Sequence, residues 1–309
     1  MILSRKALIA LTLAVLACGR SQDAKPAGKP TIALVMKTMN NPFFVDMEKG
    51  ARQAADSLGI ELVVQAPDKE TDVERQMQIV ENLISRQVSA IALVPSGSRE
   101  IVPAVGKANA AKIPVIVVDT KVDAAAMTAA RAASATFIGS DNEDGGRLAG
   151  EYLATSLGGK GEVAVLEGVA GHETSDSRMR GFRAAIAKYP GITIVASQPA
   201  NMERDLAFNV TENMLQAHPK LNGIFACNDV MALGAVEAAR TASKGGALKI
   251  VGFDAQDEAR KAVADGRMLA TVAQNPIAMG HLAVLSAWRI LHGEQVPANQ
   301  PVAIELVHK

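Results

Sequence analysis

Amide, ammonium and aromatic side chains gather in one short stretch near the start of the chain. Residues 31–44 read TIALVMKTMNNPFF, in which Lys37, Asn41, Phe43 and Phe44 follow a run of apolar and β-branched residues. Amides donate and accept hydrogen bonds together, and an aromatic ring can pack on the C–H face of a sugar. No phosphate-binding glycine loop of the GxGxxG or GK[ST] type is present. The stretch therefore predicts a polyhydroxylated ligand and not a nucleotide.

Phe43 and Phe44 have a second interpretation, as the first core residues of a helix. Pro42 precedes them, and proline is common at the first position of a helix. At this loop alone the two interpretations carry equal weight. The rest of the chain has to decide between them.

Polar residues also follow the later predicted strands of the chain. They are Asp119 after VIVV, Asn228 and Asp229 after IFAC, Asp254 after VGF, and Gln274 after TVA. Ligands of open parallel sheets bind outside the carboxyl ends of the strands. Asp229 taken alone is better interpreted as a helix N-cap before Met231. Together, the residues at the strand ends predict a hydrogen-bonding site for hydroxyl groups.

Strands and helices must alternate to place these residues together. Strands are predicted at 32–36, 60–65, 90–94, 114–118, 136–139, 162–166, 193–197, 223–226, 249–253 and 269–273. Helices are predicted at 45–58, 73–87, 101–111, 145–157, 177–188, 206–217 and 231–242. Such alternation is typical of parallel sheets with right-handed crossovers. Two successive sets of this size predict two doubly wound α/β lobes.

Composition excludes several classes of function. The 309 residues are 49% hydrophobic and 21% charged, with 32 basic and 32 acidic residues, so no basic surplus favours nucleic acid. Cys18 and Cys227 are the two cysteines, and Cys227, at the end of an apolar run, is interpreted as a small buried residue. The five histidines lack metal-binding spacing. We predict no metal and no cofactor.

The first thirty residues predict export from the cytoplasm. Arg5 and Lys6 precede an apolar run at 7–17 that is too short to span a bilayer, as in a secretory signal. The run ends VLAC at 15–18, which resembles a bacterial lipobox and implies lipidation of Cys18; ordinary signal cleavage is the alternative. Residues 19–30 read as a flexible tether. We expect a periplasmic or cell-surface protein, anchored by lipid at Cys18.

Seven motifs resemble one family in their order along the chain. They are NNPFF (40–44), VVD (117–119), SDN (140–142), ASQPA (196–200), CNDVMALG (227–234), VGFD (251–254) and TVAQNP (271–276). The chain is similar to the solute-binding proteins of bacterial ABC sugar importers, in their ribose- and allose-binding branch. The resemblance covers nearly all of residues 31–309.

The resemblance implies two lobes joined by a three-segment hinge near 140–142, 274–275 and 302–303. The implied division is a signal segment at 1–18, a tether at 19–30, a first lobe at 31–140 with 275–302, and a second lobe at 141–274 with 303–309. The implied sugar-binding residues are Asn41, Phe43, Phe44 and Asp119 from the first lobe, and Arg178, Asn228, Asp254 and Gln274 from the second lobe and its edge. Arg180 is an alternative to Arg178, because no strong motif fixes the register there.

Three departures from the ribose-binding pattern bear on the ligand. Lys37 stands where ribose binders carry a small hydroxyl residue and allose binders carry lysine. Thr120 replaces an arginine, and Met202 stands where an aromatic ring normally covers the sugar. We expect a hexose such as allose or allulose, or a related polyol. The implied partners are the monosaccharide and an ABC permease, with a chemoreceptor or sensor kinase as a further one, and the expected state is a monomer.

Three competing functions remain from the sequence. Asp119 and Asp254 could form the carboxylate pair of a glycosidase, although the neighbouring residues suit holding hydroxyls. A regulator of the lactose-repressor family shares this core but needs a helix-turn-helix before it, where this chain has a signal segment and a tether. A receptor for a hydroxylated signalling molecule would use the same two lobes.

Overall fold

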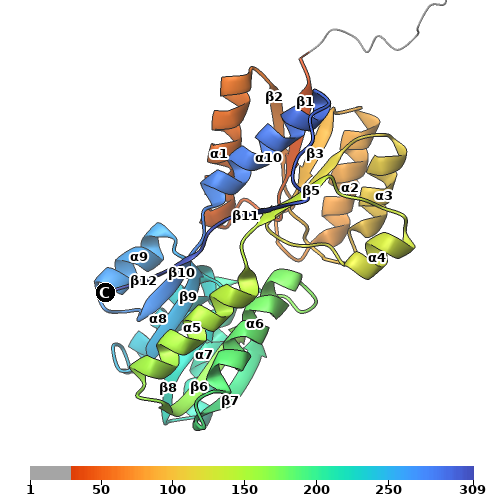
Figure 1. Ribbon diagram of the computed structural model, residues 1–309. Helices are drawn as coiled ribbons and strands as arrows, with labels where there is room; N and C mark the ends of the chain where they lie inside the picture. Colours follow the sequence, from red (N-terminus) through yellow and green to blue (C-terminus); the bar gives the residue numbers. More distant parts are fainter. Residues whose placement is uncertain (1–28) are drawn as a thin grey trace, which may run out of the picture.

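Strands and helices alternate along the chain in the computed structural model, which describes residues 29–309 (Figure 1). The first run is β1 (Thr31–Val35), α1 (Pro42–Leu58), β2 (Glu61–Gln65), α2 (Val73–Ser85), β3 (Ala90–Leu93), α3 (Val102–Ala110), β4 (Val115–Val118), α4 (Ala124–Ala129) and β5 (Thr136–Gly139). The second run is α5 (Asn142–Ser156), β6 (Lys160–Glu167), α6 (Glu173–Ile186), β7 (Gly191–Pro199), α7 (Arg204–Ala217), β8 (Leu221–Ala226), α8 (Asp229–Thr241), β9 (Lys249–Asp254), α9 (Asp257–Ala264) and β10 (Ala270–Ala273). The chain ends with α10 (Pro276–Leu291), β11 (Asn299–Pro301) and β12 (Glu305–His308).

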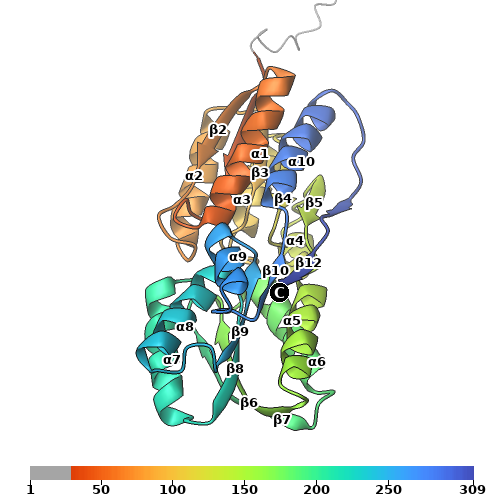
Figure 2. The ribbon, with the colours of Figure 1, turned by 90° about the vertical axis from the view of Figure 1, so that its left-hand side faces the viewer.

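Two six-stranded sheets with their helices form two lobes (Figures 1 and 2). The first-lobe sheet has the strand order β11-β5-β4-β3-β1-β2, and the second-lobe sheet has the order β12-β10-β9-β8-β6-β7. Helices α1 to α4 and α10 belong to the first lobe, and α5 to α9 belong to the second (Figure 1). All strand pairs are parallel except that of β10 with β12. The predicted two-lobed α/β fold is confirmed.

The chain passes between the lobes at three places, which join β5 to α5, β10 to α10 and β11 to β12 (Figure 1). Each connection spans only two or three residues, so few backbone dihedral angles separate the two lobes. Short segments of this kind can absorb the dihedral changes of a hinge motion.

Helices cover both faces of each sheet, so the inner strands are apolar along their whole length. Every residue of β1 from Ile32 onward, and every residue of β3 and β4, is buried. Parallel strands buried on both faces read as continuous hydrophobic runs, which is why these segments are recognisable in the sequence. In the second lobe, the rings of Phe182 and Phe225 stack 4.5 Å apart at the centre of the core.

The structure adds elements that the sequence pattern does not predict. These elements are α4, α9, α10, β11 and β12. Helix α10 is apolar on most of its surface because it packs against α1 and also against β3, β4 and β5, so its two-faced periodicity is weak. Strands β11 and β12 have three and four residues and depend on partners far away in the sequence.

Candidate functional site

The polar residues expected from the sequence lie where the carboxyl ends of the two sheets face each other. Lys37 follows β1 and Asp119 follows β4, while Asp254 ends β9 and Gln274 follows β10. Each of these four residues is less than a tenth exposed, and so are Asn41, Arg178 and Asn228. We call this region between the lobes the cleft. Buried polar groups need hydrogen-bond partners, and the cleft supplies many of them from its own residues.

Lys37 and Asp119 form a buried ion pair on the first-lobe side of the cleft. The Lys37 Nζ lies 3.3 Å from Asp119 Oδ2, and both side chains are less than 5% exposed. Thr120 Oγ1 donates to the same carboxylate oxygen at 3.1 Å. Asp119 has a φ of 63°, a left-handed conformation that aspartate tolerates better than bulky residues do. The strand end thus presents a fixed carboxylate and an ammonium group to the cleft.

Asn41 connects three different parts of the molecule. Its Oδ1 accepts from the Phe43 backbone N–H at 3.0 Å, which caps α1, and from Gln256 Nε2 of the second lobe at 2.9 Å. Its Nδ2 donates to Glu70 Oε1 at 3.1 Å. Burial raises the pKa of Glu70, against the opposing charge of Lys37. Asn41 therefore fixes a helix, a neighbouring carboxyl group and the opposite lobe together.

Glu70 and Gln256 are cleft residues that the sequence analysis missed. Glu70 follows β2 and Gln256 follows β9, so both obey the rule that polar residues beyond strand ends face the site. The signal was present in the segment PDKET at 67–71 and in the residues just after VGFD. It was obscured because both segments also read as ordinary polar loops.

Arg178 provides the fixed cation of the second lobe. Its Nε donates to Asn142 Oδ1 at 2.8 Å and its Nη1 donates to the Cys227 carbonyl at 2.6 Å. The guanidinium carbon lies 3.7 Å from the centroid of the Phe253 ring. Two hydrogen bonds and a stacked ring leave the guanidinium one orientation.

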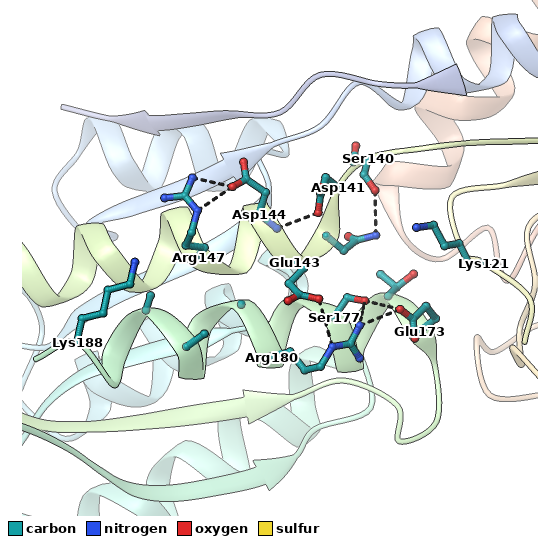
Figure 3. A pocket seen from close by; sticks show the side chains of 15 residues that line it. Lys121, Ser140, Asp141, Glu143, Asp144, Arg147, Glu173, Ser177, Arg180 and Lys188 are labelled. Carbon is teal, nitrogen blue, oxygen red and sulfur yellow. Dashed lines mark hydrogen bonds and ion pairs between the residues drawn. The ribbon is translucent and has the colours of Figure 1, made fainter. Parts of the chain in front are cut away.

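The neighbouring Arg180 lies outside the cleft, in a charged groove of ≈ 490 Å³ along α5 and α6 (Figure 3). There its Nη2 bonds Glu173 Oε1 at 3.0 Å and its Nε bonds Glu143 Oε2 at 3.3 Å. Arg147 in the same groove pairs with Asp144 and Glu151. Because these opposite charges are already paired with one another, the groove leaves fewer charged groups free to bind a ligand than the cleft does. The structure thus places Arg178, and not Arg180, beside the other cleft residues.

Asp254 and Gln274 are paired at the second-lobe edge of the cleft. Gln274 Nε2 donates to Asp254 Oδ1 at 2.8 Å, and Arg178 Nη2 lies 3.6 Å from the same oxygen. Burial raises the pKa of Asp254 to about 7, although the nearby Arg178 charge opposes the shift. Gln274 Oε1 is buried and has no partner within residues 29–309, so it is an acceptor facing this region without a donor.

Asn228, and not Asp229, caps helix α8, so the interpretation of Asp229 as the N-cap is wrong. Asn228 Oδ1 accepts from the Met231 N–H at 2.9 Å, which leaves its Nδ2 to donate elsewhere. Asp229 is the first helical residue and is fully buried. Its carboxylate accepts from Thr271 Oγ1 at 2.7 Å and from the Gln256 N–H at 2.8 Å. Asp229 thereby holds the loop that carries Gln256.

Three apolar residues expected at the sugar are packed in the lobe cores. Phe43 and Phe44 stand in the first turn of α1, their rings in edge contact 5.4 Å apart within a first-lobe core cluster. Met202 belongs to the core cluster of the second lobe. Phe43 also borders a cavity of ≈ 650 Å³ that reaches Asp254 and Gln274. Contact of Phe43, Phe44 and Met202 with a ligand stays a prediction.

Direct hydrogen bonds join the two lobes across the cleft. Besides the Asn41 to Gln256 bond, Thr120 Oγ1 and Thr174 Oγ1 lie 2.8 Å apart. The Glu173 N–H donates to Ser98 Oγ at 3.0 Å. The structure is therefore a closed arrangement, in which residues of both lobes share one buried polar region.

Other chemistry expected or excluded from the sequence can be located in part. Cys18 lies outside the described residues. Cys227 is fully buried, and burial raises the pKa of its thiol to about 12, as suits an unreactive core residue. The part of the chain from 29 to 309 contains no group of three His, Cys, Asp or Glu side chains arranged to bind a metal. In the same residues, no helix combines the length and apolar character needed to cross a bilayer.

Comparisons with known proteins agree on one family. A model of the periplasmic binding protein domain matches residues 32–295. The ribose import binding protein RbsB of Haemophilus influenzae is 40% identical over 302 residues, which cover 98% of this chain and 99% of that protein. The D-allose-binding periplasmic protein of Escherichia coli is 38% identical over 249 residues, 80% of each chain. A periplasmic solute-binding protein of an ABC transporter from Actinobacillus succinogenes, solved with bound D-allose, superposes with a TM-score of 0.87 at 40% identity, covering 91% of this chain and 98% of that one.

Proposed function

The chain belongs to the periplasmic binding protein family, and on that basis we propose its ligand and its binding site. Within the family it is a sugar-binding protein of ABC transporters, in the ribose and allose branch, and it is not an enzyme. The ligand is a monosaccharide, a hexose such as allose or allulose, or a ribose-like sugar or polyol. The protein encloses it between the two lobes and delivers it to an ABC permease.

One observation gives this proposal its main support. Polar side chains at the carboxyl ends of both sheets meet in a buried region, and hydrogen bonds between the lobes close this region. A sugar needs donors and acceptors on all sides, and the cleft has both. Lys37, Arg178 and the Asn228 amide donate, while Asp119, Asp254 and the Gln274 Oε1 accept. Bonds between charged groups and hydroxyls are stronger than neutral ones, and enclosure strengthens them further.

A hexose is favoured over ribose by the first-lobe side of the cleft. Lys37 is paired with Asp119, and Thr120 bonds both Asp119 and Thr174 of the opposite lobe. Threonine at position 120 is smaller than the arginine of the ribose-binding pattern, and its hydroxyl is bonded to residues of both lobes. Lysine at position 37 also matches the allose binders that this chain resembles, because they carry lysine at that position.

A thermal-shift screen against pentoses, aldohexoses, ketohexoses and polyols tests the proposal. A ligand that binds only the native state raises the unfolding temperature by an amount that grows with the ratio of its concentration to Kd. We expect the largest shift from D-allose or D-allulose, and we expect Asp254→Ala to abolish it. If no sugar or polyol at millimolar concentration shifts the transition, the ligand class is wrong.

We propose further that Cys18 carries a lipid that anchors the protein outside the cytoplasmic membrane. The support is the VLAC sequence at 15–18 and the polar segment that follows. Expression of the full chain and of Cys18→Ser in a bacterial host tests this. We expect the unchanged protein in the membrane fraction and the variant in the soluble fraction, and equal partition of both would contradict the anchor.

A chemoreceptor or sensor kinase would recognise the same closed pair of lobes as the permease.

A further inference from the structure

The side chain of Gln256 reaches from the second lobe to the first. Its Nε2 donates to Asn41 Oδ1 at 2.9 Å. Gln256 stands at the N-cap position of α9 but makes no side-chain cap bond to that helix. The side-chain amide is therefore free to bond the other lobe. We call the Gln256 to Asn41 bond the latch, because opening of the lobes would break it.

The backbone that carries Gln256 has a strained conformation. Asp254 has a φ of 112° and Ala255 has a φ of 53°, and both values lie in the region that favours glycine. Residues with side chains persist in such conformations only where their surroundings impose them. The turn after β9 must therefore be held by other parts of the second lobe.

Asp229 and Thr271 hold this turn from inside the lobe. Asp229 Oδ2 accepts from the Gln256 N–H at 2.8 Å, and Asp229 Oδ1 accepts from Thr271 Oγ1 at 2.7 Å. Thr271 Oγ1 in turn accepts from the Ala255 N–H at 3.2 Å. Two consecutive backbone N–H groups of the turn are thus tied to one fully buried carboxyl group, one of them directly and the other through Thr271.

The carboxyl group of Asp229 lies directly against the backbone of β9. A Cβ atom on Gly252 would lie 2.2 Å from Asp229 Oδ1, so only glycine leaves room for the carboxyl group there. Burial of a carboxyl group is costly unless hydrogen bonds compensate for it. Here one oxygen bonds the turn and the other bonds the threonine that holds the turn. The position of Gln256 is therefore what this buried group secures.

We propose that Asp229 is a positioning residue for sugar retention, which sets the turn after β9 so that Gln256 forms the latch with Asn41. The latch stabilises the closed form and raises the affinity without a contact between Gln256 and the sugar. The inference rests on the proposed function, because it needs a ligand that the closed lobes retain. It gives the turn a role distinct from that of Asp254, the cleft residue at its start.

Calorimetric titration of the mature protein with D-allose and with D-ribose tests the latch. Gln256→Ala removes the donor, and we expect its Kd to be about 3- to 10-fold higher. The ratio should be the same for each sugar that binds, because the latch does not contact the ligand. Glu258→Ala is the matched control. Glu258 lies in the first turn of α9, pairs with Arg204 of its own lobe and should leave the Kd unchanged when it is replaced.

A double-mutant cycle tests the role of Asp229. Asp229→Asn replaces one acceptor oxygen by an amide nitrogen and so loosens the turn, and we expect a Kd about 3- to 10-fold higher. Because Asp229 acts through Gln256, Asp229→Asn/Gln256→Ala should bind no more than about twofold more weakly than Gln256→Ala alone. A residue with a purely structural role would weaken binding equally in both backgrounds. Thr271→Val removes the bridging hydroxyl and takes the place of Asp229→Asn in the cycle if that variant does not fold.

The outcomes separate the two proposals. If the unchanged protein binds a sugar and Gln256→Ala binds it equally well, the latch does not contribute to retention. If Asp229→Asn, or Thr271→Val in its place, raises the Kd as much in the Gln256→Ala background as alone, Asp229 does not act through Gln256. If the unchanged protein binds neither sugar, nor any other in the thermal-shift screen, the proposed function fails and the role of Asp229 in retention fails with it.

Discussion

At the residue scale, the guanidinium of Arg178 is the most constrained charge in the cleft. The Asn142 side chain, the Cys227 carbonyl and the Phe253 ring hold it from three directions. Such an arrangement pays the entropy of ordering a long side chain before a ligand arrives. We therefore expect Arg178 to contribute more to affinity than a flexible cation at the surface could.

Substitution of the two neighbouring arginines tests this role. We expect Arg178→Gln to raise the Kd for D-allose by at least about tenfold, because a hydrogen bond from a charged donor is lost. Arg180→Gln is the matched control, since Arg180 is half-exposed in the charged groove of Figure 3. Calorimetric titration should give it an unchanged Kd. Equal losses in both variants would contradict the assignment.

Asp254 gives the unfolding free energy a predictable pH dependence. Its pKa is raised to about 7, so the folded protein keeps the proton where the unfolded chain has lost it. The stabilisation is present at low pH, declines as the pH rises from about 4 to about 7, and is absent above that range. Asp254→Asn cannot ionise. The unfolding free energy of Asp254→Asn minus that of the unchanged protein should therefore increase by at least about 1 kcal/mol from pH 4.5 to pH 7.5.

Urea denaturation at the two pH values measures this difference. Burial lowers the pKa of His172 to about 4, which gives the opposite pH dependence, but His172 is present in both proteins and its effect cancels in the comparison. A difference that stays constant between pH 4.5 and 7.5 would show that Asp254 ionises normally in the folded protein.

The strand-end rule explains which cleft residues could be predicted from the sequence. Lys37, Asp119, Asp254 and Gln274 each follow an apolar strand that is easy to recognise, so their position at the sheet edge follows directly. The bond from Gln256 to Asn41 was not predicted, because it depends on how the loop after β9 meets the opposite lobe. Contacts between lobes come from tertiary geometry that no local pattern encodes.

At the element scale, α5 and α6 approach closely because glycines replace side chains at their contact. A Cβ atom on Gly146 would lie 2.0 Å from the Arg178 carbonyl oxygen, and one on Gly181 would lie 1.9 Å from the Glu143 carbonyl oxygen. No side chain fits at these distances. The turn of α6 that carries Arg178 therefore rests directly on the backbone of α5.

Gly146→Ala should disturb both the fold and the cleft. The added methyl group has to push α6 away, which we expect to cost about 1–3 kcal/mol of unfolding free energy and to weaken D-allose binding through displacement of Arg178. Gly106→Ala in α3 is the control, because its Cβ would meet nothing closer than 4.0 Å. There alanine should stabilise the helix by about 0.5–1 kcal/mol and leave binding unchanged. Urea denaturation and titration check both variants, and a neutral Gly146→Ala would contradict the close contact.

The elements that the sequence predicted are those with one buried periodic face or a continuous apolar run. Helix α1 begins at Pro42, three residues before the predicted start, because Asn41 caps it and brings Phe43 and Phe44 into its first turn. That placement supports the core interpretation of the two rings. Helix α10 was not predicted, because a helix packed on two sides lacks a polar face.

At the scale of the whole molecule, a few hydrogen bonds and the buried polar residues hold the two lobes together, while the three short connections allow the lobes to move apart. Closed and open arrangements can interconvert about these segments, and a ligand favours the closed one because only there do both lobes contact it. Within residues 29–309, few direct hydrogen bonds join the lobes, so a sugar that bonds both lobes should add much of the closing free energy.

A cross-link between the lobes reports this closure. Thr120 Oγ1 and Thr174 Oγ1 lie 2.8 Å apart, so cysteines at both positions should form a disulfide in the closed form. In a Cys18→Ser background, we expect oxidation of Thr120→Cys/Thr174→Cys to be several-fold faster with saturating D-allose than without it. Each single-cysteine variant is a control, and Cys227 is buried and unreactive. Equal rates with and without sugar would show that the ligand does not shift the lobes.

The most direct test of the account is a crystal structure grown with the sugar that gives the largest thermal shift. We predict one sugar molecule between the lobes, with hydroxyl groups bonded to Asp119 or Lys37 on the first lobe and to Arg178 and Asp254 on the second. A sugar bound instead in the charged groove of Figure 3, or contacting one lobe only in a closed protein, would contradict the central claim that both sheets share one ligand.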